Sequence, residues 1–283
     1  MRRAFPLTRR GLLLAGMAAL GAPAMAQDLL DPRLIAAADR FALAHVLTGN
    51  PEVDAMAEAG LRGLSMQLAA RTTVEPGPVL GIDLDTDDIA VLSILYWPIT
   101  ADQPPPGPAA YLMLDRWLRG GGLLVVDTRD ADIAGFAPSD TTPAAGHLLA
   151  PLAIPPLAPV PADHVLTRSY YLLDSFPGRH DAGTVWVEAA PAAPEGQPLG
   201  GTLNDGVTPV VIGGNAWADA WAVDESGLPL TALGAGFEGE RQRELAYRFG
   251  INLVMLALTG NYKSDQVHVQ AILDRLDRRE GGP

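Results

Sequence analysis

The stretch SILYWPITADQPPPGPAAYLMLDRWLRGGGLLVVD, residues 93–127, decides the predicted fold. Two uninterrupted apolar runs, 93–99 and 123–127, flank a segment that begins at Pro108 and is stopped by the three glycines at 120–122. Apolar runs without alternation are typical of strands buried on both faces. A proline at the first helical position and a glycine after the last are typical of a helix. The stretch therefore predicts a strand, a helix and a second, parallel strand.

The same alternation extends toward the N-terminus. Residues 41–47 and 79–84 are two further apolar runs that predict strands. Between them, Asn50 and Pro51 begin a helix whose apolar residues recur every three or four positions as far as Arg71. Strands that alternate with helices in this way predict an α/β fold, in which a parallel sheet carries helices on both faces.

The second half of the chain is less regular. Five prolines between 151 and 161 exclude a helix or a central strand there. Strands are expected at 184–188 and 207–213, followed by a hairpin that turns at 225–227 and a long helix over 240–258. Gly260 and Asn261 are expected to end that helix, and Ser264 to cap a last one that runs to about residue 278. Without a clear linker, residues 41–283 form one predicted domain with a decorated second half, and 27–40 form a helical lead-in.

The first 26 residues have the features of an export signal. Arg9 and Arg10 directly precede the apolar run 11–22, and a small-residue cleavage site, Ala24-Met25-Ala26, follows. Paired arginines at this place are typical of twin-arginine signals, so the sequence predicts a periplasmic protein. The alternative is an uncleaved anchor, but the run is about 12 residues where a spanning helix needs about 20. No later stretch is long and apolar enough to span a membrane.

Charge and cysteine content exclude several functions. Removal of the signal takes four arginines and no acid, so the formal charge falls from −13 to −17. Such a surface repels phosphate backbones, which argues against nucleic-acid binding. The absence of cysteine excludes a thiolate nucleophile and a cysteine-ligated zinc ion.

Two acidic clusters, 83–88 and 127–132, follow predicted strands. Ligands bind at the carboxyl ends of strands in open parallel sheets, and grouped carboxylates can hold calcium or magnesium. The alternative is that these acids cap the following turns. Arg129 is either half of an internal ion pair or a clamp for an anionic ligand. The aromatic pair at the end of 93–99 either stacks on a ligand or packs in the core. The candidate ligand-binding residues are Tyr96, Trp97, Asp127, Arg129 and Asp130.

Other catalytic patterns are missing from the sequence. None of the five histidines has a partner at a metal-ligand spacing, and His45, inside an apolar strand, is expected to be a core residue. There is no Gly-x-Ser-x-Gly elbow and no glycine-rich phosphate loop. We therefore assign no catalytic residue and no cofactor from the sequence, and leave the question of a metal open.

Several blocks of sequence resemble one bacterial family, the domain of unknown function 4159. They are 94–100 (ILYWPIT), 125–130 (VVDTRD), 163–168 (DHVLTR), 176–179 (FPGR) and 258–268 (LTGNYKSDQVH), and the resemblance covers 41–276. The resemblance implies a flavodoxin-like fold similar to class I glutamine amidotransferases. Those enzymes carry a nucleophilic cysteine in a sharp turn after a central strand, which here falls near Asp127 and Arg129. Without cysteine, that route to amide hydrolysis is closed.

Two functional hypotheses follow. The first is an exported, non-catalytic domain of the cell envelope that binds an unknown ligand or envelope protein at the strand-end crevice. The second is a hydrolase that uses the turn at 127–132, with or without a metal, on a cell-wall or carbohydrate substrate. An enzyme of the second kind needs carboxylates that converge on an open pocket. A binding scaffold is expected to use those acids in caps and ion pairs.

Overall fold

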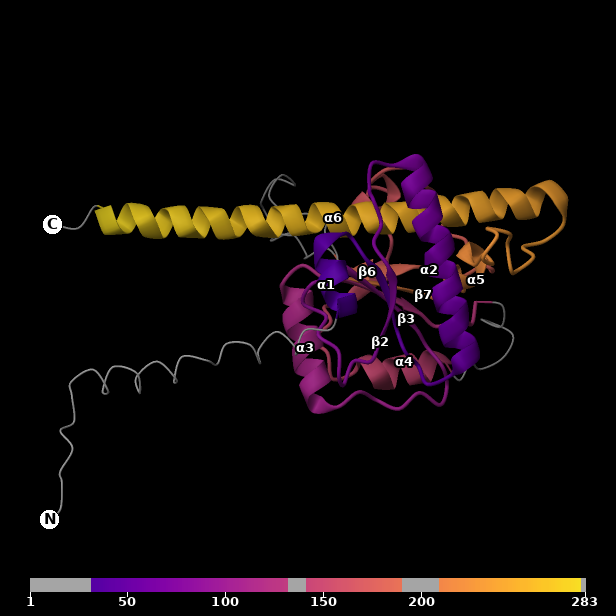
Figure 1. Ribbon diagram of the computed structural model, residues 1–283, viewed down its shortest axis with the longest axis horizontal. Coiled ribbons are helices and arrows are strands. Elements are labelled where there is room, and N and C mark those ends of the chain that lie inside the picture. Colours follow the sequence, from indigo (N-terminus) through magenta and orange to yellow (C-terminus); the bar gives the residue numbers. More distant parts are fainter. Residues whose placement is uncertain (1–31, 132–140, 190–208, 281–283) are drawn as a thin grey trace, which may run out of the picture.

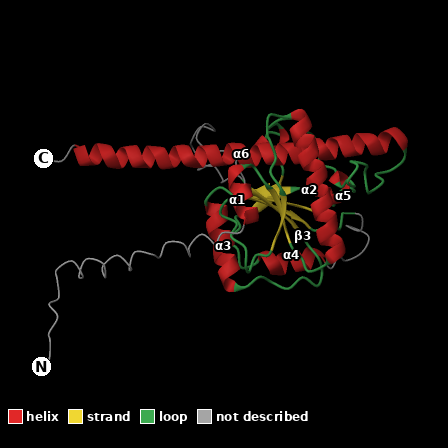
Figure 2. Cartoon of the chain, viewed as in Figure 1, coloured by secondary structure: helices red, strands yellow, loops and turns green. Residues whose placement is uncertain are grey.

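The computed structural model describes residues 32–131, 141–189 and 209–280. Seven strands form one sheet in the order β2-β1-β3-β4-β7-β6-β5. Helices lie on both sides of the sheet (Figures 1 and 2). The strands are β1 (Leu43–Val46), β2 (Val79–Ile82), β3 (Ile94–Pro98), β4 (Leu123–Asp127), β5 (Leu157–Pro159), β6 (Trp186–Glu188) and β7 (Val210–Gly213). The helices are α1 (Pro32–Asp39), α2 (Pro51–Arg71), α3 (Pro108–Arg119), α4 (Thr141–Leu149), α5 (Trp217–Trp221) and α6 (Gly236–Glu280).

The predicted α/β class and the four parallel strands of the first half are confirmed. Strands β2, β1, β3, β4 and β7 pair in parallel, an arrangement consistent with a flavodoxin-like fold. The sheet as a whole is mixed, because β6 pairs antiparallel with β7, and β5 antiparallel with β6. The proline-rich segment supplies β5 at the sheet edge, where a missing N–H donor costs least.

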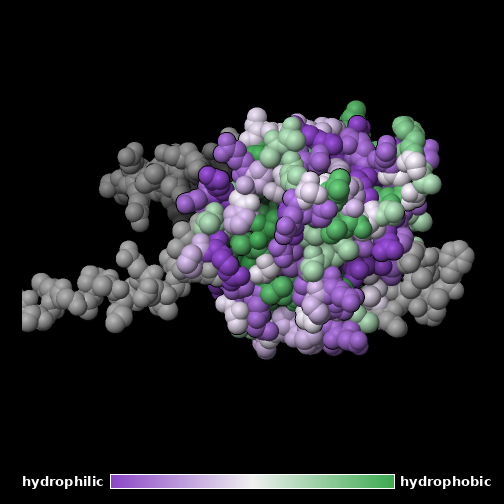
Figure 3. Space-filling view, turned by 45° about the vertical axis from the view of Figure 1, so that its right-hand side comes forward, coloured by the Kyte–Doolittle hydropathy of each residue, from purple (hydrophilic) through white to green (hydrophobic). Residues whose placement is uncertain are grey.

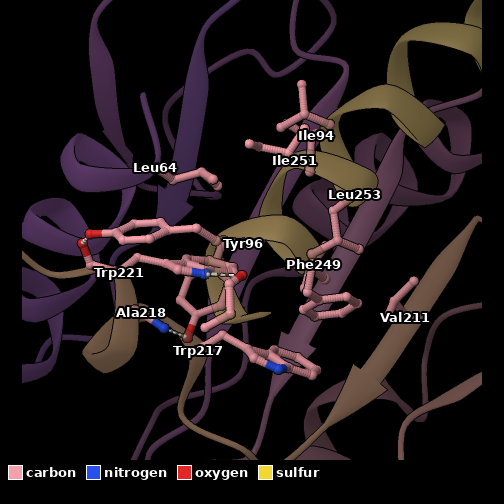
Figure 4. Close-up of a cluster of buried hydrophobic side chains, with 14 of the residues drawn as sticks. Leu64, Ile94, Tyr96, Val211, Trp217, Ala218, Trp221, Phe249, Ile251 and Leu253 are labelled. Carbon is pink, nitrogen blue, oxygen red and sulfur yellow. Dashed lines mark hydrogen bonds between the residues drawn. The ribbon is translucent and has the colours of Figure 1, made fainter. Parts of the chain in front are cut away.

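Alternate residues of the central strands serve two separate cores. Leu95, Trp97 and Val126 face α1, α3 and α4, and Tyr96 and Val125 face α2, α5 and α6. Figure 4 shows the second core, in which the rings of Tyr96 and Trp221 lie 6.0 Å apart between their centroids. Burial on both faces explains why these strands are apolar at every position except Asp127, the last residue of β4.

The helix α2 begins as the sequence predicts. The side chain of Asn50 accepts hydrogen bonds from the backbone N–H groups of Glu52 and Val53, and Pro51 occupies the first helical position. The helix packs closely on α5, because a Cβ atom at Gly60 or Gly63 would lie within 3 Å of the α5 backbone. This contact places α2 against a helix that lies more than 150 residues later in the sequence.

The predicted break in the C-terminal helix is wrong. The helix α6 continues through Gly260 and Asn261 to Glu280, and its last part extends past the layered body (Figure 1). A glycine inside a helix costs only about 1 kcal/mol, and no proline follows to force an end. The expected hairpin after α5 is confirmed by an antiparallel bridge between Val223 and Pro229.

The surface carries no single large apolar face in the view of Figure 3, where hydrophilic residues surround small groups of hydrophobic ones. None of the helices in the described segments is long and apolar enough to cross a membrane.

Candidate functional site

A pocket of about 930 Å³ opens at the carboxyl ends of β1, β3 and β4. The chain passes from β1 outward to β2 and then returns to β3 on the other side of β1, so the strand order reverses between β1 and β3. Crevices at such reversal points are the usual ligand sites of open α/β sheets. The lining residues are Thr48, Gly49, Asn50, Pro51, Glu52, Val53, Ile99, Thr100, Ala101, Asp102, Pro104, Arg129 and Thr141.

Residues 48–53, which follow β1, form one wall of the pocket and are held by local hydrogen bonds. The carboxylate of Asp54 accepts from the backbone N–H of Thr48 at 2.8 Å and from its hydroxyl at 2.7 Å. Gly49 has a φ of +81°, which only glycine adopts without strain. The cap of Asn50 satisfies the first N–H groups of α2, so the start of this helix has few donors left for a ligand.

Asp127 ends β4 and is completely buried. Its Oδ1 accepts from the backbone N–H of Arg129 at 3.0 Å and of Ala216 at 3.1 Å. Its Oδ2 accepts from the backbone N–H of Trp217 and the hydroxyl of Tyr96, each at 2.7 Å. Burial raises the pKa of Asp127 to about 6, although all four donors act to lower it. This carboxylate ties the turn after β4 to the start of α5.

Arg129 is the charged side chain of this turn that reaches the pocket. Its backbone is left-handed, with a φ of 58°, and is held there by the N–H bond to Asp127. The side chain is 27% exposed, and its Nη2 lies 3.9 Å from Oδ2 of Asp219, an ion pair too long for a hydrogen bond. Asp219, on α5, is buried and accepts a hydrogen bond from Arg179 at 3.2 Å.

The other candidate residues are buried. Asp130 accepts from the hydroxyls of Thr128 and Thr142, each at 2.5 Å. Tyr96 and Trp97 are at most 2% exposed and belong to the two cores, so of the two alternatives for this aromatic pair the structure shows packing in the core. Of the five candidates, only Arg129 lines the pocket; Asp127 and Asp130 shape the turn that holds it.

The first acidic cluster serves as caps, as the simpler interpretation predicts. The carboxylates of Asp83, Asp85, Asp87 and Asp88 each accept a backbone N–H, and Asp85 thereby reaches the residue before α3, Gly107, at 2.7 Å. Within the described ranges, no three or more His, Asp or Glu side chains are grouped so as to hold a metal ion. Asp132 lies outside the described residues.

His45 is a core residue, as predicted. It is buried in β1, and burial lowers its pKa. The lowered pKa favours the neutral imidazole, which a buried site tolerates.

Sequence reasoning missed several residues of the site. Glu52 and Asp102 line the pocket, and Asp219 pairs with Arg129. The sequence predicts a helix start at Asn50 directly after a strand, and this pattern could have indicated that the residues there line a crevice. Nothing local marks Asp219, because its partners lie 40 and 90 positions earlier in the chain.

Comparison with known proteins identifies a family but no characterised relative. No curated protein matches the chain. One family model matches residues 42–258, which include the whole sheet and every residue of the pocket. The chain therefore belongs to the family described as Domain of unknown function (DUF4159).

Proposed function

We propose that this protein is an exported, non-catalytic domain of the cell envelope that binds a small polar ligand in the pocket at the ends of β1, β3 and β4. The observation that carries the proposal is Arg129, a partly exposed guanidinium at the rim of a crevice of about 930 Å³. Its position at a strand-order reversal is where α/β proteins usually bind ligands.

The turn after β4 supports a similarity to class I glutamine amidotransferases. β4 is the central strand of the sheet, and the turn after it is sharp, with a left-handed residue at Arg129. The resemblance stated above implies a nucleophile in such a turn. The chain has no cysteine and presents a guanidinium there instead, which suits anion binding better than amide hydrolysis.

The hydrolase alternative receives less support from the same turn. Asp127 accepts four hydrogen bonds and is enclosed, and both oxygens of Asp130 accept from threonine hydroxyls. Neither carboxylate faces the pocket. Acids used in this way hold a scaffold together, which is the arrangement expected of a binding domain.

Export is part of the proposal and rests on the sequence. Arg9 and Arg10 precede a short apolar run and a small-residue cleavage site, and these residues lie outside the described ranges. A periplasmic location would place the pocket among the soluble compounds of the envelope.

A pocket-blocking variant tests the proposed function. Ala101 is exposed and lines the pocket, so Ala101→Trp should fill it without disturbing the core. Ala109, exposed on α3 and away from the lining, provides the matched control Ala109→Trp. Each purified mature protein is equilibrated with the small-molecule fraction of a periplasmic extract, and retained compounds are identified by mass spectrometry. A compound retained by the wild type and by Ala109→Trp, but not by Ala101→Trp, is the expected result. Equal retention by all three, or by none, would refute binding in this pocket.

A further inference from the structure

The guanidinium of Arg129 has hydrogen-bonding capacity that the described residues do not use. A guanidinium carries five N–H donors in a planar fork. Across the described ranges, the Arg129 side chain makes no hydrogen bond, only the 3.9 Å ion pair with Asp219. Asp219 has a closer partner in Arg179, which reaches its Oδ1 at 3.2 Å, whereas its buried Oδ2 faces Arg129 without a hydrogen bond. The fork of Arg129 is therefore available to a ligand in the pocket.

The backbone that carries this guanidinium is held in place. It is kept in the left-handed conformation by a bond to Asp127, which is itself held by three other donors. A side chain that projects from a rigid turn loses less conformational freedom on binding. A planar fork on such a turn favours a carboxylate, which it binds through two parallel hydrogen bonds.

The rest of the pocket carries the opposite charge. Glu52, at the start of α2, and Asp102, after β3, line the pocket, and both residues are exposed. Neither carboxylate forms a hydrogen bond or an ion pair with the residues that the structure describes. Among the described residues that line it, the pocket has one cation and two acids, and it selects against a simple anion, because the acids repel it. It suits a ligand that also carries a positive charge.

The strand order gives the scale of the distance between the backbone positions that carry the two charges. Arg129 follows β4 and Glu52 follows β1, with β3 between these strands. Two strand spacings amount to about 10 Å. An extended chain advances roughly 3.3 to 3.6 Å per residue, so about three residues span that distance.

We propose that the pocket binds a short peptide of about three residues, with its carboxylate on Arg129 and its α-ammonium group toward Glu52 and Asp102. This inference rests on the proposed function and names the ligand class for the same pocket. A free amino acid holds its two charges too close together to reach from Arg129 to Glu52.

Isothermal titration calorimetry of the mature protein with tri-alanine tests this assignment. The companion probes are tri-alanine amide, N-acetyl-tri-alanine and free alanine. Tri-alanine is expected to bind. Each blocked peptide is expected to bind at least about tenfold more weakly, since a hydrogen-bonded charge contributes that much or more. Alanine is expected to bind more weakly than either blocked peptide.

Two arginine variants supply the matched comparison. Arg129→Gln removes the charge at the rim, and we expect it to weaken tri-alanine binding by about tenfold or more. Arg119→Gln removes the charge of an exposed arginine at the end of α3, outside the pocket lining, and should leave the affinity within about threefold. Melting curves of both variants establish that they fold.

The outcomes separate this inference from the proposed function. Equal binding of tri-alanine and its amide, or equal affinity of Arg129→Gln and wild type, would overturn the peptide assignment. So would a failure of tri-alanine to bind while the wild type retains an extract compound that Ala101→Trp loses, and that result would leave the proposed function standing. If the extract experiment also fails, both proposals fall.

Discussion

Replacing Asp127 by alanine tests whether the hydrogen bonds in the turn after β4 stabilise the fold. The substitution removes the one carboxylate that accepts from Arg129, Ala216, Trp217 and Tyr96. The tyrosine hydroxyl can rotate to another acceptor and the N–H of Arg129 lies beside the open pocket, but the N–H groups of Ala216 and Trp217 lose their partner in a region closed to solvent. Asp127→Ala should therefore destabilise the fold strongly.

The size of the loss follows from the unpaired donors. A buried group left without its hydrogen bond costs about 1–3 kcal/mol, so two buried backbone groups predict a loss of at least about 2 kcal/mol. In a domain of this size, 1 kcal/mol shifts the melting temperature by roughly 2–4 °C, which predicts a fall of at least about 4–8 °C. The assay is thermal unfolding at pH 7.5, monitored by circular dichroism.

Asp224→Ala is the matched control. The carboxylate of Asp224 also accepts two backbone N–H groups, those of Ser226 and Leu228, and one hydroxyl, but it lies at the surface. Water replaces a lost acceptor at the surface, so the fall in melting temperature should be clearly smaller. Equal melting temperatures for wild type and Asp127→Ala would refute the argument, since the buried network would then contribute nothing measurable.

Three further predictions concern packing, pH and export. Gly63→Ala should lower stability by about 1–3 kcal/mol, because its Cβ would lie 1.9 Å from the backbone oxygen that ends α5. Gly146→Ala on α4, with open space around it, should not lower stability, and similar losses in thermal unfolding for the two would contradict the packing. Because the pKa of Asp127 is raised to about 6, the pH-dependent part of its contribution to stability is fully present below about pH 4 and is lost as pH rises through 6, while the hydrogen bonds of the carboxylate remain. Thermal unfolding of the wild type relative to Asp127→Asn should show the larger advantage at pH 4 than at pH 7.5, and a constant difference would argue against the shift. The double change Arg9→Lys and Arg10→Lys should leave the precursor in the cytoplasm on cell fractionation, whereas normal periplasmic accumulation would contradict the twin-arginine assignment.

The local sequence determined the elements of this protein. Apolar runs at β1 to β4, the Asn50-Pro51 helix start and the glycine stop after α3 each depend on neighbours a few residues away. Burial periodicity and helix capping depend on nearby residues, so these patterns made the α/β class and the parallel first half predictable. The break expected at Gly260 failed because glycine only weakens a helix, and local preference alone does not decide where a helix ends.

Only the tertiary structure decided which polar residues face solvent. Asp127 and Arg129 are two positions apart, yet one is enclosed and the other lines a pocket. The difference comes from Ala216 and Trp217, whose N–H groups lie 89 and 90 positions along the chain from Asp127. The pairing of β4 with β7 brings these donors to the carboxylate, and a burial that depends on such distant partners leaves no pattern in the local sequence.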